Sequence, residues 1–304
     1  MTSVLKNIAL IGASGNIGQI LLAALQESSE FKVTVITRSS SEATFPEGTN
    51  VRKSDFSDDD LLSAFRGQDA VISAVGATGF AEQKKLVDLA IQAGVARFIP
   101  SEFSADSQND AVLALLPLFR QKKEVIEYLQ SKQSTSFTWT GLACSGLFDW
   151  GIANGFLGFD ITARTATIWD GGNKSFTFTN QKQLGDALIA ILEQPKATTN
   201  QYLYISSVET TQKEVLAALE SATSSKWTVN NVTTDTEVSE AIKKLQAGDF
   251  SGAFTLVRAT SFGDIPNLDS NYAKDRVLAN ELLGLEAENV QQTITRVVQE
   301  AKSA

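Results

Sequence analysis

The stretch IGASGNIGQ, residues 11–19, places glycines at Gly12, Gly15 and Gly18 between an apolar run and a segment with helical spacing. The run NIAL at 7–10 has the character of a buried strand, and IGQILLAAL at 17–25 repeats apolar residues at the helical period. In a strand–turn–helix unit of this kind the helix opens with free amides, and the glycines let phosphates approach the backbone. We therefore expect a dinucleotide pyrophosphate here, although the spacing G-x-x-G-x-x-G is one residue longer than the general fingerprint. A glycine-rich turn without a ligand is the alternative.

The second apolar run indicates which nucleotide is bound. KVTVIT at 32–37 leads directly into Arg38, twenty positions after Gly18, where an NAD-binding protein would carry an acid. An arginine there suits the 2′-phosphate of NADP, and Ser39 and Ser40 add hydroxyl groups beside it. The sequence thus predicts NADPH/NADP as the cofactor, with an exposed loop arginine as the alternative.

Strand-like and helical segments alternate through the first half of the chain. The expected strands are 7–13, 32–37, 69–76, 97–103 and 136–143, and the expected helices are 17–27, 58–65, 81–93 and 117–132. Apolar strands alternating with helices are typical of a parallel sheet covered on both faces. The fold class predicted is therefore α/β, a doubly wound, Rossmann-like parallel sheet.

The second half has a less regular pattern. TATIWDGGNKSFTFT at 165–179 predicts a hairpin that turns at Asp170 to Asn173, followed by a helix at 183–193 and a strand at 201–206. A final helix is expected near 287–302. We expect an NADP-binding domain at 1–150 and a smaller α+β substrate region at 151–304, with some segments returning to the main sheet.

Composition excludes several classes of protein. The 304 residues carry a net charge of −9 without a basic cluster, which argues against a nucleic-acid partner. No histidine is present, so we expect no metal site of the usual kind, and Cys144 and Ser145 lack an imidazole to activate them for hydrolysis. No apolar run is long enough for a membrane span, and the start lacks signal-peptide features. We expect a cytoplasmic monomer or homodimer that acts on a small molecule.

The helix predicted at 117–132 carries the best acid–base candidate. Its Tyr128 and Lys132 match the Tyr-x-x-x-Lys pair of short-chain dehydrogenases, but a helical wheel puts Tyr128 off the apolar face, so we interpret the match as accidental. Lys122 falls at the centre of that face, with Leu118 and Ile126 one turn away on either side. A lysine there either extends its amine to solvent or serves a function.

Two further clusters have structural explanations. The acids at 55–60 could attract a cation, but Ser57 is placed to cap a helix whose first turn favours acids. An aromatic cluster could line a substrate pocket or belong to the core. Its members are Phe148, Trp150, Phe156 and Phe159.

Taken together, these motifs resemble the NmrA-like group of atypical short-chain dehydrogenases, in particular the isoflavone, pinoresinol-lariciresinol and phenylcoumaran benzylic ether reductases. The stretches that carry the resemblance are IGASGNIG, Arg38, SAVG at 73–76, the Gln83 helix, ARFIPSEF at 96–103 and Phe119 with Lys122. The resemblance implies NADPH binding and a catalytic lysine within Phe-x-x-Lys, which falls on Lys122. After SEF the chain departs from the plant pattern with SADSQNDAV at 104–112, and it is more similar to fungal members.

The sequence thus predicts an NADPH-dependent reductase of a small, aromatic or secondary-metabolite substrate, with Lys122 as general acid or base. The residues expected at the cofactor are Gly12, Ser14, Gly15, Asn16, Ile17, Gly18, Arg38, Ser39, Ala74, Val75, Gly76, Gln83, Pro100, Ser101 and Glu102. Those expected at the substrate are Phe103, Phe148 and Trp150. A non-catalytic NADP redox sensor that binds a protein is the alternative, although such regulators generally lack the lysine. A nucleotide-sugar epimerase ranks last, because it needs a tyrosine that is missing here.

Overall fold

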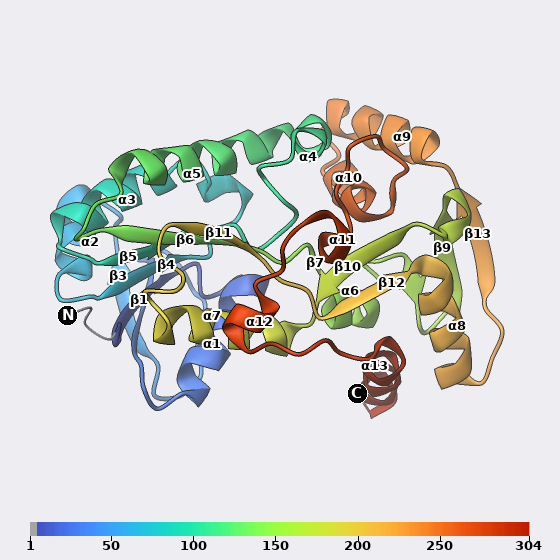
Figure 1. The fold of residues 1–304 in the computed structure, drawn as a ribbon, viewed down its shortest axis with the longest axis horizontal. Helices are drawn as coiled ribbons and strands as arrows, with labels where there is room; N and C mark the ends of the chain where they lie inside the picture. Colours follow the sequence, from blue (N-terminus) through green and yellow to red (C-terminus); the bar gives the residue numbers. More distant parts are fainter. Residues whose placement is uncertain (1–4, 304) are drawn as a thin grey trace.

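The computed structural model describes residues 5–303 and has a larger and a smaller half (Figure 1). The larger half is built on seven strands. These are β1 (Asn7–Ile11), β2 (Lys32–Arg38), β3 (Asn50–Ser54), β4 (Ala70–Ser73), β5 (Arg97–Ile99), β6 (Thr138–Ala143) and β11 (Gln201–Tyr204). They form one parallel sheet in the order β11-β6-β5-β4-β1-β2-β3. The predicted fold class is confirmed.

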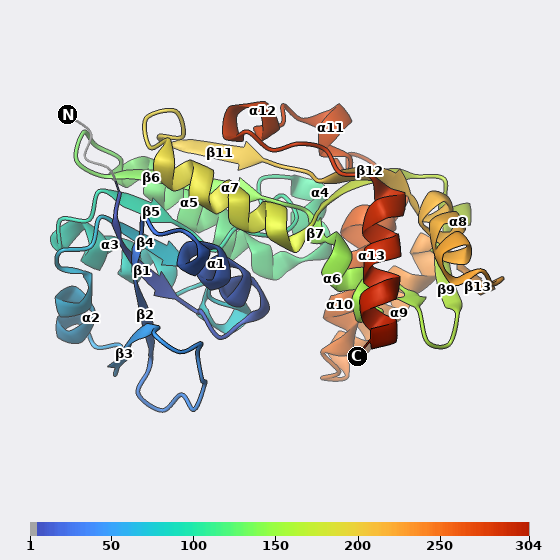
Figure 2. The same cartoon turned by 90° about the horizontal axis from the view of Figure 1, so that it is seen from below.

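Helices cover both faces of this sheet, because successive side chains of a buried strand point to opposite sides. Leu10 of β1 packs with α1 (Asn16–Glu27) and α7 (Gln181–Glu193) on one face, which Figure 2 shows side by side. Ile11 packs on the other face with α2 (Asp58–Phe65), α3 (Gln83–Gln92) and α5 (Arg120–Lys132). Helix α2 has the bounds that the sequence predicts, and Ser57 caps it by accepting a bond from the amide of Asp60.

Strand β3 was not expected from the sequence, and the expected strand β11 joins the large sheet from the second half of the chain. The edge strand β3, NVRKS, is mostly exposed and polar, so it lacked an apolar signal. The strand expected at 201–206 is present as β11 and pairs with β6, so the chain returns to the large sheet after leaving it. Helix α7, which precedes β11, packs on α1. The segment around Ala279 and Leu283 packs in the same core, so the large half is assembled from three separate stretches of sequence.

The smaller half contains two three-stranded sheets. Its strands are β7 (Gly146–Leu147), β8 (Phe159–Asp160), β9 (Thr165–Trp169), β10 (Ser175–Thr179), β12 (Val208–Thr211) and β13 (Thr228–Val232). One sheet has the order β12-β10-β7 and the other β13-β9-β8. Its helices are α4 (Asp110–Leu115), α6 (Phe148–Ala153), α8 (Gln212–Thr223), α9 (Thr234–Gln246), α10 (Ser251–Phe262), α11 (Tyr272–Asp275) and α13 (Val290–Ser303). The short helix α12 (Asn280–Leu283) packs on the large half, where Leu283 lies in the same core as α7.

The hairpin predicted at 165–179 is wrong, because β9 and β10 lie in different sheets. Asp170, Gly171 and Gly172 between them all have positive φ, and Asp170 accepts hydrogen bonds from Thr234 at the start of α9. This anchored turn directs β9 to pair in parallel with β13, whereas β10 pairs with β12. The turn residues of a hairpin were present, but contacts distant in sequence decided the pairing.

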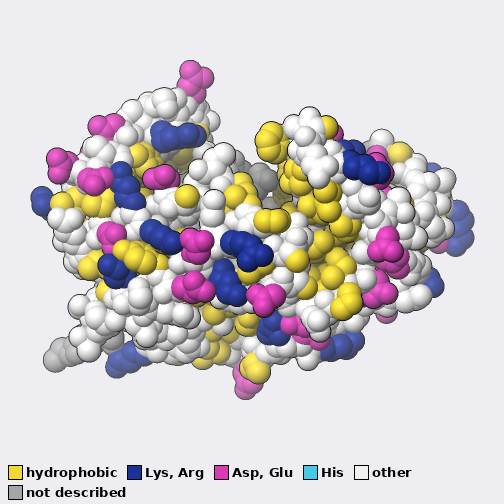
Figure 3. Space-filling model, turned by 90° about the horizontal axis from the view of Figure 1, so that it is seen from above, with side chains coloured by type: hydrophobic (Ala, Val, Ile, Leu, Met, Phe, Trp, Pro, Cys, Tyr) yellow, Lys and Arg dark blue, Asp and Glu magenta, His cyan; other side chains and the backbone are white. Residues whose placement is uncertain are grey.

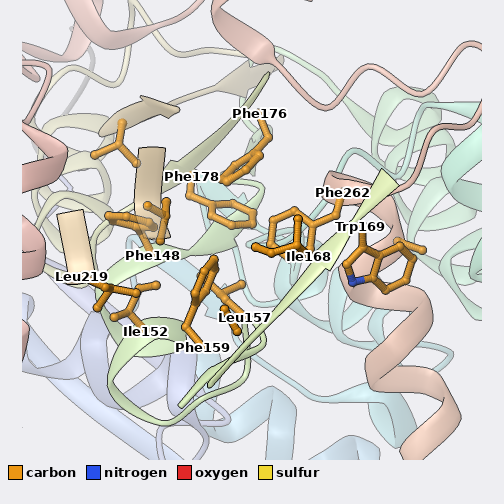
Figure 4. Packing of buried hydrophobic residues seen from close by; sticks show 14 of the residues in the cluster. Phe148, Ile152, Leu157, Phe159, Ile168, Trp169, Phe176, Phe178, Leu219 and Phe262 are labelled. Atoms are coloured by element: carbon orange, nitrogen blue, oxygen red, sulfur yellow. The ribbon is translucent and has the colours of Figure 1, made fainter. Parts of the chain in front are cut away.

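The two small sheets share one aromatic core. Phe176 and Phe178 of β10 pack against Phe262 of α10, with ring centroids 5.0 and 5.9 Å apart. Figure 4 shows these rings together with Phe148 and Phe159, and both of the latter are almost fully buried. The core therefore joins α6, α10 and both small sheets into one body beside the large sheet.

Among residues 5–303, no helix is both long enough and apolar enough to span a membrane.

Candidate active site

A groove of about 350 Å³ runs along the carboxyl ends of β1, β2 and β4. Seven of the residues expected at the cofactor line it, namely Gly12, Ser14, Gly15, Arg38, Ala74, Val75 and Gly76. This is the edge of a doubly wound sheet at which ligands bind. The groove also contacts Phe56, Thr78 and Gly79, which gave no signal in the sequence beyond their places after β3 and β4.

The glycines of the first turn divide into two kinds. A Cβ on Gly12 would lie 2.4 Å from the carbonyl oxygen of Ala74, and a Cβ on Gly18 would lie 2.1 Å from the carbonyl oxygen of Gly12. These two glycines therefore allow strand, turn and helix to pack. Around Gly15 and Gly76 there is space: a Cβ on Gly15 would have only the Gly12 oxygen near it, at 3.6 Å, and a Cβ on Gly76 would have nothing within 4 Å. Because both line the groove, their bare backbone leaves room for a ligand.

The amino end of α1 is open toward this space. Its N-cap is Gly15, no side chain caps it, and its first turn holds no acid. Such an end presents unpaired amides and the positive end of the helix dipole, which suits a phosphate. The turn and the groove therefore fit the pyrophosphate of a dinucleotide.

Arg38 stands at the end of β2 with an exposed side chain and lines the same groove as Ser41. Lys53 of β3 donates to the carbonyl oxygen of Ser41 and adds a second cation near this end. Ser39 is exposed, and its amide donates to the carbonyl of Ser54 at 2.7 Å. The geometry supplies a basic end to the groove, as a ribose phosphate requires.

The other residues expected at the cofactor lie behind the groove or beside it. Gln83 is fully buried, its Oε1 accepts from the amide of Ser101 at 2.8 Å, and its Nε2 has no partner among the described residues. The Ser101 hydroxyl donates to the carbonyl of Val75, which ties the ends of β4 and β5 together. Pro100 is buried next to Ser101. These contacts hold the floor of the groove at Val75 in place.

Lys122 of α5 is only 3% exposed, as its place on the apolar face indicated. Its Nζ donates to Ser104 Oγ at 2.9 Å and to the Glu102 carbonyl at 3.4 Å. The rings of Phe80 and Phe119 stand 4.7 and 4.8 Å from Nζ, at cation–π distance. No carboxylate of the described residues lies within 4 Å of it, so the ammonium is buried without an ion pair.

This environment shifts two pKa values. Burial lowers the pKa of Lys122 from its ordinary 10.5, and the Glu102 carboxylate partly opposes that shift. Burial raises the pKa of Glu102, whose Oε2 accepts hydroxyl bonds from Ser107 and Tyr202 while Oε1 has no partner among the described residues. A lysine that releases its proton more easily suits general acid–base work near neutral pH.

The start of α5 differs from the prediction. A short 3₁₀ turn at 117–119 precedes the helix, which begins at Arg120, and Leu118 is 43% exposed instead of buried. Pro117 opens this tighter turn, so the residues before 120 leave the helical wheel. Tyr128 and Lys132 lie far along the helix, and both side chains contact Asp88 near the surface. The interpretation of their spacing as accidental agrees with this position.

A second cavity, of about 210 Å³, adjoins the groove at the amino end of α1. Asn16 and Ile17 line the cavity, whereas the preceding Ser14 and Gly15 line the groove. Ser104 and Phe119, the neighbours of Lys122, lie in the cavity wall. The first turn of α1 and the surroundings of Lys122 therefore meet at one space.

Most of the cavity wall is apolar, as a pocket for an apolar molecule requires. Phe103, Trp150 and Phe156 all line it, and the rings of Trp150 and Phe156 lie 5.4 Å apart. Phe148, expected at the substrate, is 0% exposed, packs in the core against Phe178 and does not line the cavity. The aromatic cluster thus serves both as pocket and as core.

Phe80, Ser104 and the residues that α10 contributes to the cavity were not expected from any sequence pattern. Phe80 and Ser104 follow strand ends, so their position in the chain is the one signal that could have found them. No group of three potential metal ligands occurs among residues 5–303.

The parallel sheet, the glycine turn and the groove beside it define a Rossmann-type α/β protein. The chain belongs to the NmrA-like family, whose model matches residues 5–277. It is similar to the oxidoreductase aprR of Aspergillus flavus, with 35% identity covering 96% of this chain and 98% of aprR. It is also similar to the oxidoreductase poxI of Penicillium oxalicum, with 30% identity covering 94% and 92% of the two chains. The prediction of an enzyme of the oxidoreductase class is confirmed by these relatives.

Among solved structures, the fold resembles the binary complex of leucoanthocyanidin reductase with NADPH from Vitis vinifera. The TM-score is 0.77 at 18% identity, and the match covers 96% of this chain and 99% of the reductase. The fold also resembles that of an isoflavone reductase, with a TM-score of 0.77 at 21% identity over 96% of this chain and 99% of that reductase. The resemblance to the isoflavone and pinoresinol-lariciresinol reductases, which the motifs indicate, is confirmed at the level of the fold.

Proposed function

We propose that this protein is an NADPH-dependent reductase of a small apolar, aromatic molecule, with Lys122 as its general acid or base. The observation that carries the proposal is the meeting of groove and cavity at the first turn of α1, next to a buried lysine. A cofactor in the groove and a substrate in the cavity would then contact each other where Lys122 can act. The NADPH in the similar leucoanthocyanidin reductase complex supports the choice of cofactor.

The cofactor would be held by the chain at three places. The amides at the start of α1, with Gly15 beside them, would bind the pyrophosphate. Arg38 would form paired hydrogen bonds to the 2′-phosphate. The backbone of Ala74 to Gly76 would lie along the nicotinamide half. When bound, this cofactor supplies a hydride.

The protein's own part is positioning and proton transfer. Phe103 and Trp150 would hold an aromatic ring and exclude water from the cavity. Lys122 donates to Ser104 Oγ, and Ser104 lines the cavity, so a proton held at Nζ can reach a substrate oxygen through the Ser104 hydroxyl. The low exposure of Lys122 and its lowered pKa favour release of that proton.

Calorimetry of the purified protein with NADPH and NADH tests the cofactor. We expect NADPH to bind at least about tenfold more tightly, because a charge-assisted contact to the extra phosphate favours it. NADPH oxidation with a panel of aromatic ketones, enones and quinones then tests the reaction. If NADPH does not bind, the groove has been misinterpreted and the proposal fails.

A further inference from the structure

Arg258 of α10 contributes a cation to the wall of the substrate cavity. It is the one charged residue among those that line this space, which are otherwise apolar or neutral. The helix belongs to the smaller half of the molecule, and Arg258 lines the same cavity as Ser104 and Phe119, which belong to the segments around Lys122. Figure 3 shows a band of hydrophobic side chains on the part of this half that faces the middle of the molecule, with charged side chains on the surface of both halves. A charged group in such surroundings needs an explanation.

Two contacts with the protein fix the guanidinium in place. One terminal nitrogen donates to the carbonyl oxygen of Phe156 at 3.2 Å, and the other donates to Thr255 Oγ1 at 2.9 Å. The carbon between them lies 5.7 Å from the centre of the Phe156 ring. These bonds use two of the five N–H groups of an arginine, so three are left for another acceptor.

Other partly buried arginines of the chain have acidic partners. Arg276 pairs with Asp106 and Asp269, and Arg52 pairs with Asp60. Arg258 has no carboxylate within 4 Å among residues 5–303, although Glu237 of α9 acts on it from farther away.

Arg97 also lacks an acid, but its guanidinium is satisfied in another way. It donates to four threonine hydroxyls and to the Pro195 carbonyl.

Burial lowers the pKa of Arg258, which shows that its surroundings disfavour the charge. Arg258 thus has neither an ion pair nor a full set of hydrogen bonds. Because Arg258 lines the cavity, its remaining N–H groups are available to a ligand there.

We propose that Arg258 binds a carboxylate of the substrate, so that the enzyme acts on an aromatic or otherwise apolar acid. This rests on the proposed function, because it takes the cavity as the substrate site. A planar carboxylate matches the guanidinium fork, and the apolar wall strengthens such a pair. The acid group lies at the α10 end and the reacting carbon at the Ser104 end. Arg258 determines which substrate is held and in which direction, while Lys122 serves the reaction.

A pair of ligands that differ in charge tests this directly. Calorimetry measures 2-naphthoate and its neutral analogue 2-naphthamide against the full chain saturated with NADP⁺. We expect the wild-type protein to bind the carboxylate at least about tenfold more tightly than the amide. We expect Arg258→Gln to lose this preference, because glutamine is polar but carries no charge. Arg258→Lys restores part of it.

The control variant is Arg66→Gln, which removes one positive charge from an exposed position at the end of α2. It should keep the full preference for naphthoate. Equal binding of the two ligands by the wild-type protein, or no binding of naphthoate at millimolar concentration, overturns the proposal without any variant. So does a folded Arg258→Gln protein that still prefers the carboxylate.

The same titrations separate this proposal from the proposed function. NADP⁺ is titrated first, and its binding does not involve Arg258. If NADP⁺ binds and the carboxylate preference is absent, only the assignment of Arg258 fails. If NADP⁺ does not bind, the proposed function itself fails.

Discussion

Replacing Lys122 with methionine should stabilise the protein and strongly reduce its turnover. Methionine has nearly the length of lysine and suits the space between the Phe80 and Phe119 rings. No buried acceptor loses its last partner, because Ser104 Oγ itself donates to the Glu102 carbonyl at 2.7 Å. The substitution therefore removes an unpaired buried charge and leaves a packed apolar group.

The size of the effect follows from opposing contributions. Lys122 loses one good hydrogen bond to Ser104 and two ring contacts, but the lowered pKa shows that desolvation outweighs the attractions that favour its charge. Replacing a buried ion pair with well-packed apolar side chains of similar volume is neutral or stabilises a protein by roughly 1–4 kcal/mol. We expect Lys122→Met to gain about 1–3 kcal/mol at pH 7 and to lose turnover by about 10²–10⁴-fold, with NADPH affinity unchanged.

The stability that Lys122→Met gains over the wild-type protein should decrease as the pH rises. The folded protein holds the Lys122 proton less tightly than the unfolded chain, whose lysine has the ordinary pKa of 10.5. Between the lowered pKa and 10.5 the unfolded state binds more protons, so wild-type stability rises with pH in that window. The advantage of the methionine variant should be largest below the window and shrink as pH approaches 10.5.

Urea unfolding of both proteins from pH 7 to 10, together with NADPH oxidation, measures these quantities. Lys123→Met is the matched control, since Lys123 pairs with the exposed Asp110 at 3.2 Å and should change stability by less than about 1 kcal/mol. A Lys122→Met protein that is less stable than the wild type at pH 7 would refute the argument from burial. One that keeps its turnover would remove Lys122 from the reaction.

Three further predictions concern the groove and the core. Arg38→Ala should weaken NADPH binding about 10- to 100-fold and leave NADH binding unchanged in calorimetry; equal losses for both would place the 2′-phosphate elsewhere. Gly18→Ala should lower the melting temperature or unfold the chain, since its Cβ would lie 2.1 Å from the Gly12 oxygen. Gly76→Ala should keep the wild-type melting temperature but bind NADPH more weakly. Cys144 is buried and burial raises its pKa to about 12, so a thiol reagent should label it only after unfolding; rapid labelling of the native protein would contradict that burial.

The local part of the site could be predicted from the sequence. The unit β1–turn–α1 depends on neighbouring residues: glycines where a Cβ would collide, and apolar residues at the strand and helix periods. Lys122 could be found because its helix shows a periodic apolar face, with Ile126 buried as expected. Arg38 could be proposed as a cofactor contact because of its distance along the chain from the glycines. Each of these signals lies within one or two elements.

Tertiary structure alone decided the rest. Whether β9 paired with β10 or with β13 depended on the anchoring of Asp170 by Thr234, a contact between residues 64 positions apart. Phe148 and Trp150 are two residues apart, yet one is in the core and the other at the cavity. The cavity exists because α10 packs against the segments around Ser104, and only this packing brings Arg258 to its wall. Periodicity shows that a face is buried, but the partner of that face is chosen by contacts between distant segments, which no local pattern records.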